Sequence, residues 1–219
     1  MGVGAEVTAR KGFLGGTFDP VHAAHLVLAD EAYRQLGLDG VWFLPAGQPW
    51  MKRDVPLTAK EHRLAMVELA VASDKRFHVS TLELDRPGDT YTVDTLEALR
   101  AEAADEELWF IVGADTLASM HRWKDPARVL ELARIAVATR PGHERLDLGA
   151  LEEVAPSARE RVTSLRMPTM DVSGTEVRRR AAGGETMSGL VPEAVAAYIE
   201  RHDLYGGTRA ETAATATEG

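Results

Sequence analysis

The sequence predicts a doubly wound, Rossmann-like α/β fold, with one parallel sheet, helices on both faces and a single domain. Short apolar runs alternate with helical patterns along most of the 219 residues, as strands and crossover helices do in a parallel sheet. Several runs are almost continuously apolar, most clearly residues 108–112, which indicates burial on both faces. The length is sufficient for one domain with a substantial core.

Each element follows from a local pattern. Residues 13–14 begin the first strand, and the helix predicted over 24–35 stops at Gly37, a glycine typical of helix C-termini. Thr58 and Glu61 form an expected capping box for a helix that runs to residue 73. The remaining strands are expected at 41–44, 77–80 with an extension through 84, 108–112, 135–139 and 161–165, and the remaining helices at 93–103, 172–182 and 192–201.

Composition excludes several classes of protein. The net charge of −9 argues against a nucleic-acid partner, which needs a basic face. The chain has no cysteine, which excludes a disulfide scaffold and a cysteine nucleophile and fits a reducing cytoplasm. No apolar run approaches the length of a membrane span. We therefore expect a cytoplasmic protein with no nucleic-acid or membrane partner, with homo-oligomerisation left open.

Domain boundaries follow from the composition of the two ends. Residues 1–10 are small and polar, which predicts a flexible leader. Residues 206–219 contain almost nothing to bury, which predicts a disordered tail. The folded domain is therefore expected over residues 11–205.

The most informative segment is residues 15–25, Gly-Gly-Thr-Phe-Asp-Pro-Val-His-Ala-Ala-His. Gly15 and Gly16 let the backbone approach a ligand closely. His22 and His25 are three residues apart, so both face the same way at the start of a helix. Helix N-termini attract anions through their free N–H groups. The segment predicts a phosphate cradle with hydrogen-bond donors built in.

Two other interpretations of this segment stay open. The two histidines could be half of a metal site, but zinc usually takes at least three protein ligands, and the chain has no cysteine and no His-Glu-x-x-His helix. We therefore expect no metal site built from protein ligands. The glycines could also be a simple turn, with the histidines as ordinary helix-cap residues.

Candidate ligand-binding residues also follow later strands, at the edge where parallel sheets bind ligands. Lys52 lies in a proline-rich loop, where it either reaches a phosphate or stays solvated. Gly113 and Asp115 follow the apolar run at 108–112. Asp115 can accept hydrogen bonds from a ribose or cap the next helix.

Three further residues have alternative roles. Trp123 either belongs to the core or stacks on an aromatic ring beside a cleft. Thr92 lies at a helix start, where it supplies a hydroxyl group or caps the helix. Arg63 lies within a predicted helix and is expected to be a surface or salt-bridge residue.

A second candidate phosphate site lies at residues 171–180, Asp-Val-Ser-Gly-Thr-Glu-Val-Arg-Arg-Arg. Ser173 is typical of an N-cap, Thr175 falls in the first turn and Arg178 follows one turn later. Hydroxyl and guanidinium groups at a helix N-terminus suit a polyphosphate. The alternative is a capped amphipathic helix with a basic exposed face.

Together the two motifs resemble those of the bacterial nicotinate-mononucleotide adenylyltransferases, in the nucleotidyltransferase superfamily. Residues 15–25 are similar to the family signature Gly-Gly-[Thr/Ser]-Phe-[Asp/Asn]-Pro-x-His-x-Gly-His. Residues 173–178 are similar to the motif Ile-Ser-Ser-Thr-x-Ile-Arg, with Val172 and Val177 in place of its isoleucines. The resemblance covers residues 12–205. Ala24 and Gly174 depart from the pattern, because a glycine and a small residue such as serine are usual there.

The resemblance implies an enzyme of NAD biosynthesis that transfers AMP from ATP to nicotinate mononucleotide. The products would be nicotinate adenine dinucleotide and pyrophosphate, and Mg²⁺ would be held mainly through the ATP phosphates. Three segments resemble the nicotinate branch of the superfamily: residues 45–52, residues 91–96, and residues 113–115 with Trp123 downstream.

The resemblance also implies roles for individual residues. His22, His25 and Arg178 would be catalytic, stabilising the transition state and the leaving pyrophosphate. The implied ATP-binding set is Gly15, Gly16, Thr17, Phe18, His22, His25, Gly113, Asp115, Ser173, Thr175 and Arg178. The implied mononucleotide-binding set is Lys52, Thr92 and Trp123.

Other functions remain as alternatives. The acceptor could be nicotinamide mononucleotide or another phosphorylated compound such as phosphopantetheine. A protein of a different class, a non-catalytic nucleotide sensor on the same fold, would be favoured by loss of a motif histidine or arginine. His22, His25 and Arg178 are all present, which favours the enzyme.

Overall fold

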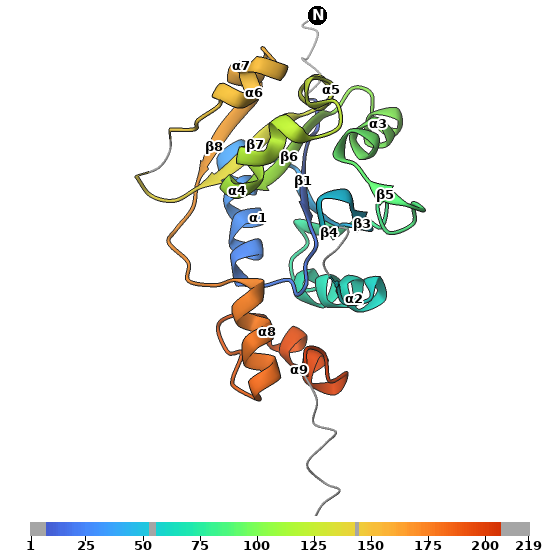
Figure 1. The fold of residues 1–219 in the computed structure, drawn as a ribbon, viewed down its shortest axis with the longest axis vertical. Coiled ribbons are helices and arrows are strands. Elements are labelled where there is room, and N and C mark those ends of the chain that lie inside the picture. The colour runs from blue at the N-terminus through green and yellow to red at the C-terminus, as the bar shows by residue number, and fades with distance from the viewer. Residues whose placement is uncertain (1–7, 53–55, 143–144, 207–219) are drawn as a thin grey trace, which may run out of the picture.

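The computed structural model describes residues 8–52, 56–142 and 145–206. Its main sheet has six parallel strands in the order β4-β2-β1-β6-β7-β8 (Figure 1), which confirms the predicted fold. The strands are β1 (Arg10–Gly16), β2 (Gly40–Pro45), β4 (Phe77–Val79), β6 (Glu107–Gly113), β7 (Arg134–Thr139) and β8 (Val162–Arg166). The predicted leader and tail fall mostly outside the described residues, and β1 already begins at Arg10.

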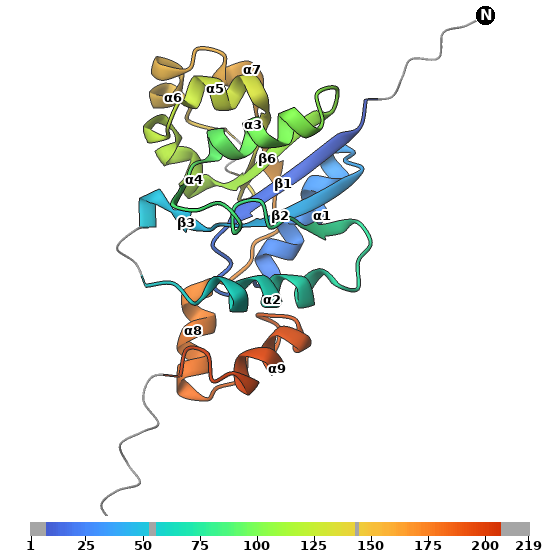
Figure 2. The ribbon, with the colours of Figure 1, turned by 90° about the vertical axis from the view of Figure 1, so that its right-hand side faces the viewer.

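Helices cover both faces of the sheet, as Figure 2 shows. On one face α1 (Ala23–Leu36), α2 (Lys60–Val71), α8 (Gly174–Gly183) and α9 (Glu193–Arg201) share a core with Leu14 and Ile111. On the other, α3 (Thr92–Glu102), α5 (Pro126–Leu132), α6 (Gly149–Val154) and α7 (Ala158–Arg161) pack with Phe13 and Phe110. Successive strand residues point to opposite faces, so burial on both sides requires the continuous apolar runs seen in the sequence.

The strand order places a switch point between β1 and β6. From β1 the chain crosses to β2 and then β4 on one side, whereas β6 leads to β7 and β8 on the other. In such sheets the crevice beyond the carboxyl ends of the two central strands is where ligands bind. Gly15 and Gly16, which were expected in a turn, are the last two residues of β1, and the segment from Gly15 to Pro20 is called the glycine turn below. Like Gly113 at the end of β6, the two glycines lie at the carboxyl ends of the central strands.

Most predicted helices are confirmed with small shifts at their ends. The stop at Gly37 is confirmed: its φ is 60°, in the left-handed region that glycine adopts without strain, and its N–H donates to the Tyr33 carbonyl. Ser173 caps α8 as expected, because its hydroxyl accepts from the N–H of Glu176 at 3.2 Å. Within the described residues, no helix has the length and apolar character needed to cross a bilayer.

Two local predictions are wrong. The strand at residues 77–80 ends at Val79, and the expected extension is a turn in which the Asp85 N–H donates to the Thr81 carbonyl. The capping box at Thr58 does not form, because α2 begins one residue later with Ala59 in the cap position. The backbone N–H of Thr58 donates instead to a carboxylate oxygen of Asp19, at 3.0 Å.

Several short elements were not predicted. A two-stranded parallel sheet joins β3 (Gln48–Pro49) to β5 (Asp89–Thr90), and α4 (Ala114–Ser119) follows β6 directly. The helices α5, α6 and α7 were also missed. All of them are at most seven residues long, too short to show a clear hydrophobic period in the sequence.

Candidate active site at the switch point of the sheet

The two motif histidines form a stacked pair at the N-terminus of α1. His22 occupies the cap position and His25 lies one turn later. Their rings are 3.7 Å apart between centroids with a 25° angle between planes. The backbone N–H of His22 donates to Nδ1 of His25 at 3.2 Å. The predicted pairing of the imidazoles at a helix start is thus what the fold produces.

Both histidines are neutral at neutral pH. Burial lowers the pKa of His22 to about 4. Burial also lowers the pKa of His25 well below its usual value, and the neighbouring His22 adds to that effect. Because Nδ1 of His25 accepts a hydrogen bond, the neutral ring carries its proton on Nε2. His25 therefore offers a fixed N–H donor.

The turn before the histidines is shaped by two aromatic rings. A Cβ on Gly15 would lie 2.7 Å from the Phe110 ring, and one on Gly16 would lie 3.0 Å from the Phe18 ring. Phe18 is 1% exposed and its φ is 48°, and its ring meets the His25 ring edge-on at 4.9 Å. Only the backbone of Phe18 can reach a phosphate, because its side chain is part of the core.

The second motif meets the first in space. Arg178 donates through Nη1 to the carbonyl oxygen of Asp19 at 2.6 Å and through Nη2 to the Thr175 hydroxyl at 3.3 Å. Gly174 permits this approach, since a Cβ there would lie 3.3 Å from the guanidinium and 3.4 Å from the Asp19 carbonyl. The N-terminus of α8 therefore abuts the turn that leads into α1.

A cavity of about 440 Å³ opens beside the glycine turn. Besides the residues of the glycine turn, three predicted residues lie on its wall. They are Thr92 at the first position of α3, Asp115 in α4, and Trp123, whose ring meets Phe110 edge-on. The described residues that line it are Gly15, Gly16, Thr17, Ala46, Pro49, Trp50, Met51, Glu83, Thr90, Thr92, Phe110, Val112, Asp115, Thr116, Ser119 and Trp123.

Glu83 is a buried acid in the wall of this cavity that the sequence did not single out. It is 5% exposed and accepts a hydrogen bond from the Thr95 hydroxyl at 2.9 Å. Burial raises the pKa of Glu83 to about 7, against the opposing effects of that hydrogen bond and of Arg86. The carbonyl of Glu83 also lies so close to Gly47 that a Cβ there would overlap it, which makes a glycine necessary in this loop.

Arg63 corrects a prediction. It was expected at the surface or in a salt bridge, but it is 2% exposed. Its guanidinium donates to the backbone carbonyls of Thr58 at 3.0 Å, Thr17 at 2.7 Å and Gly47 at 3.3 Å. The buried Arg63 side chain therefore connects three segments: the turn that carries Thr17, the loop after β2 that carries Gly47, and the residues just before α2.

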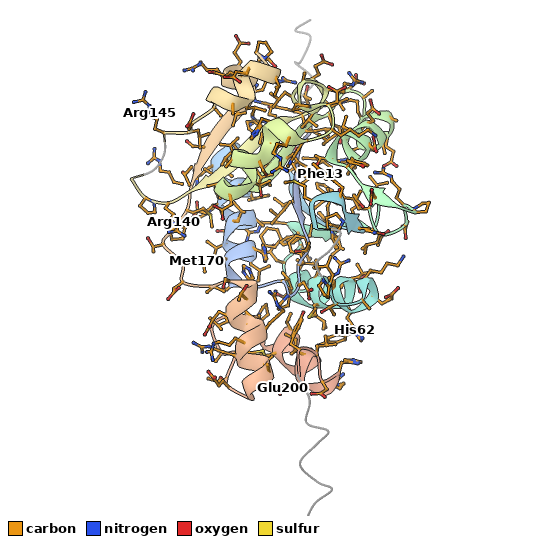
Figure 3. All side chains as sticks on the ribbon, in the orientation of Figure 1. Phe13, His62, Arg140, Arg145, Met170 and Glu200 are labelled. Atoms are coloured by element: carbon orange, nitrogen blue, oxygen red, sulfur yellow. The ribbon has the colours of Figure 1, made fainter. Side chains whose placement is uncertain are left out.

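A second cavity, of about 600 Å³, lies on the other side of Asp115. Arg140, Arg145 and Met170 on its wall lie along one flank of the molecule, at the left of Figure 3. The described residues that line it are Ala24, Ala114, Asp115, Leu117, Ala118, Ala138, Thr139, Arg140, Arg145, Leu146, Asp147, Met167, Pro168 and Met170. Asp115 is exposed and lines both cavities, so the two spaces meet at the sheet edge.

Comparison with known proteins identifies the family. The cytidylyltransferase-like family matches over residues 13–180. A protein of Roseiflexus sp. strain RS-1 named probable nicotinate-nucleotide adenylyltransferase is 46% identical over 198 residues, which are 90% of this chain and 98% of the relative. A protein of Paenarthrobacter aurescens with the same name is 45% identical over 88% of this chain and 89% of its own length.

The chain belongs to the nicotinate-nucleotide adenylyltransferases. A solved relative supports the fold independently. The Plasmodium falciparum nicotinic acid mononucleotide adenylyltransferase complexed with NaAD has a TM-score of 0.74 at 18% identity, over 90% of this chain and 97% of that one.

Within this adenylyltransferase, the predicted site residues fall into four sets. Arg178 reaches the turn that joins the glycines to the histidine pair. Thr92, Asp115 and Trp123 line the adjoining cavity, and Gly113 is the last residue of β6, directly before α4. Ser173 and Thr175 use their hydroxyls within α8. Lys52 ends the short 3-10 helix η1 (Trp50–Lys52), and its side chain lies outside the described part of the structure, so its role stays a prediction.

Sequence reasoning missed buried residues that hold this adenylyltransferase site together. Glu83 lay in a segment interpreted as a strand, and Arg63 in a helix whose apolar pattern gave no sign of its depth. One signal in the sequence could have indicated the burial of Arg63. Arg63 lies one helical turn before Met66 and Val67, so this charged residue falls on the apolar face of α2. Such a residue is buried only when its polar atoms have partners.

Proposed function

We propose that this chain transfers AMP from ATP to nicotinate mononucleotide, giving nicotinate adenine dinucleotide and pyrophosphate for NAD biosynthesis. The observation that carries the proposal is the position of the neutral histidine pair. It follows the glycine turn that lines the first cavity, and Ala24, between the two histidines, lines the second. Membership of the nicotinate-nucleotide adenylyltransferases supports the same reaction.

Each cavity suits one substrate. The first offers Trp123 for stacking on a pyridine ring and the free N–H groups at the start of α3, near Thr92, for the nicotinate carboxylate. None of its described lining residues is a lysine or arginine. The second cavity takes the adenosine, and Asp115, which it shares with the first, accepts hydrogen bonds from ribose hydroxyls. Lys52 is proposed for the mononucleotide phosphate.

The chemical step is one in-line displacement. A phosphate oxygen of the mononucleotide attacks the α-phosphorus of ATP, a new P–O bond forms, and the bond to the β-phosphate oxygen breaks to release pyrophosphate. The attacking phosphate is already ionised near neutral pH, so no general base is required. Catalysis then consists of positioning and charge stabilisation. The Nε2–H of His25, the His22 ring and the Arg178 guanidinium are the groups proposed to donate to phosphate oxygens.

Mg²⁺ is proposed to bind mainly through the ATP phosphates. The side chains at the turn are imidazole, guanidinium and hydroxyl donors, which complement phosphate oxygens. Among the described residues, no three His, Cys, Asp or Glu side chains gather as ligands for a metal ion. Mg²⁺ prefers oxygen ligands and keeps several waters. When bound, it neutralises charge on the phosphates.

The test is pyrophosphate release with ATP and Mg²⁺, comparing nicotinate mononucleotide with nicotinamide mononucleotide at matched concentrations. We expect a strong preference for nicotinate, because the free N–H groups at the start of α3 favour a carboxylate over an amide. Preference for the amide would contradict the pocket assignment. Release with neither acceptor would contradict the proposed reaction and favour another acceptor or a nucleotide sensor.

A variant separates the mononucleotide pocket from the phosphate site. Replacing Trp123 with Ala removes the proposed stacking surface, worth about 1 kcal/mol or more. The KM for nicotinate mononucleotide should rise at least fivefold or so, while the KM for ATP is unchanged. Trp123→Phe should restore most of the affinity. Equal KM values for Trp123→Ala and the wild type would place this tryptophan in the core alone.

A further inference from the structure

The turn that carries Asp19 is where three distant segments of the chain come into contact with it, through Thr58, Arg178 and Tyr205. Its carboxylate accepts from the Tyr205 hydroxyl at 2.7 Å and from the backbone N–H of Thr58 at 3.0 Å. Its carbonyl accepts from Arg178 at 2.6 Å. Asp19 is 9% exposed and lies inside the turn between the glycines and His22. The partner furthest along the chain, Tyr205, is 186 residues away.

The end of α9 delivers Tyr205 to this place. Asp203 adopts a left-handed conformation with a φ of 47° just after the helix. The N–H of Leu204 donates to the Ile199 carbonyl at 3.0 Å and that of Asp203 to Glu200 at 3.3 Å, which is the Schellman pattern of helix termination. Leu204 and Tyr205 then pack against the core on the α1 face. The chain is thereby turned back toward the site.

Tyr205 is held in a conformation that a tyrosine rarely adopts. Its φ is 66°, a left-handed backbone that persists in a bulky residue only where surrounding contacts require it. Burial, together with its hydrogen bond to Asp19, raises the pKa of the Tyr205 hydroxyl. The group therefore keeps its proton and remains a donor to Asp19 across the whole working range of pH.

We propose that Tyr205 is a positioning residue for the transfer reaction, whose hydroxyl fixes Asp19 and through it the alignment of His22 and Arg178. The inference rests on the proposed function. No Lys, Arg or His among the described residues donates a hydrogen bond to the Asp19 carboxylate. The carboxylate instead accepts hydrogen bonds from the Tyr205 hydroxyl and from the Thr58 N–H. Loss of one leaves a buried carboxylate oxygen unsatisfied. The carboxylate then moves toward water, and the turn carrying the Arg178 contact moves with it.

The test compares Tyr205→Phe with Tyr198→Phe. Phenylalanine keeps the half-buried ring and removes only the hydroxyl. Tyr198 is the matched control, because its hydroxyl forms a half-buried hydrogen bond with Nδ1 of His62 at 2.9 Å, between α2 and α9. His62 is labelled in Figure 3. We expect Tyr205→Phe to lower kcat roughly 10-fold, because small misplacements of reacting groups are costly. Tyr198→Phe should keep the wild-type kcat.

A double-mutant cycle with Asp19→Asn separates positioning from general destabilisation. If Tyr205 acts through Asp19, the double variant should have the kcat of the slower single variant and not the product of the two losses. Melting temperatures are measured for all variants. Wild-type kcat in Tyr205→Phe, additive losses in the cycle, or equal kcat losses in the Tyr205 and Tyr198 variants would each overturn the proposal. If Tyr205→Phe melts at a lower temperature than the wild type, the cycle still distinguishes positioning through Asp19 from general destabilisation.

Failure of the proposed function is distinguishable from failure of this inference. If the wild type releases no pyrophosphate, the reaction is wrong. The role of Tyr205 is then measured through ATP affinity by titration calorimetry, since the proposed contacts of Arg178 and the histidines with the ATP phosphates do not require that transfer follows. Weaker ATP binding in Tyr205→Phe, but not in Tyr198→Phe, would support the inference, and equal affinities would overturn it.

Discussion

The guanidinium of Arg178 lies 2.6 Å from the carbonyl oxygen of Asp19, across 159 positions of sequence. This contact brings the two motifs together into the surface that we propose for phosphate binding. The Nη2 atom of the same guanidinium donates a hydrogen bond to the Thr175 hydroxyl at 3.3 Å. Contacts with its own helix and with the turn before the histidines therefore hold the Arg178 guanidinium in one position. A guanidinium held in this way suits the proposed polyphosphate ligand.

Replacing Arg178 with Lys tests this arrangement. Lysine keeps the charge but lacks the planar fork that contacts the Asp19 carbonyl, Thr175 and a phosphate together. We expect kcat to fall about 100-fold, with the KM for nicotinate mononucleotide little changed. Steady-state kinetics with each substrate varied in turn measure both values. A KM effect confined to the mononucleotide would contradict the assignment of Arg178 to ATP.

His25→Ala removes the fixed Nε2–H donor from the proposed phosphate site. Loss of one such donor costs about 100- to 1,000-fold in kcat. The fold should persist, because the backbone N–H of His22 can bind water at the helix start. The kcat and the circular dichroism spectrum of the variant check both expectations. Near-normal turnover in a folded variant would show that His25 is only a helix-cap residue.

The histidine pair also makes stability depend on pH. In the folded chain the pKa of His22 is about 4, against 6.5 for a solvated histidine side chain. Between these values the unfolded chain binds more protons, so the free energy of unfolding falls as the pH drops from 7 to 4. At pH 5 His22 alone should contribute a loss of about 2 kcal/mol relative to pH 7. Urea unfolding of the wild type and of His22→Asn/His25→Asn at both pH values measures the difference, and equal pH slopes would contradict it.

Glu83 should act in the opposite direction. Its pKa rises from 4.5 to about 7 in the folded chain, so the folded state binds more protons between these values and stability falls as the pH rises toward 7. Glu83→Gln removes this titration and retains an oxygen that can accept from Thr95. The variant should therefore gain stability over the wild type on going from pH 5 to pH 8. Thermal denaturation at the two pH values tests this, and a constant difference between the proteins would count against it.

Arg63→Met should destabilise the chain and loosen both substrate sites. The change leaves the carbonyls of Thr17, Gly47 and Thr58 without their donor, and each unsatisfied group costs about 1–3 kcal/mol. We expect the free energy of unfolding to drop by about 3 kcal/mol or more, and both KM values to rise. Arg34→Met is the matched control: its side chain is 59% exposed in pairs with Asp30 and Glu31, and such pairs contribute about 1 kcal/mol or less. Equal effects of the two substitutions would contradict the proposed role of Arg63.

The sequence alone determined those features that depend on local pattern. The apolar runs at 108–112 and 135–139 specify buried parallel strands, because burial on both faces leaves no polar alternation. Gly37 specified the end of α1 through its left-handed backbone. The glycine turn, the histidines and Arg178 could be selected as site residues because their chemistry and their position at helix starts are readable without coordinates.

Only the tertiary structure decided which residues hold these groups in place. The burial of Arg63 depends on three loops that converge on it, and the pKa of Glu83 depends on its desolvation in the cavity wall. Tyr205 contacts Asp19 because a Schellman turn ends α9 beside the turn that carries Asp19. Contacts between residues so far apart depend on how the elements pack. A local pattern carries the preference of one segment, and the partner that a buried polar group requires is supplied by another.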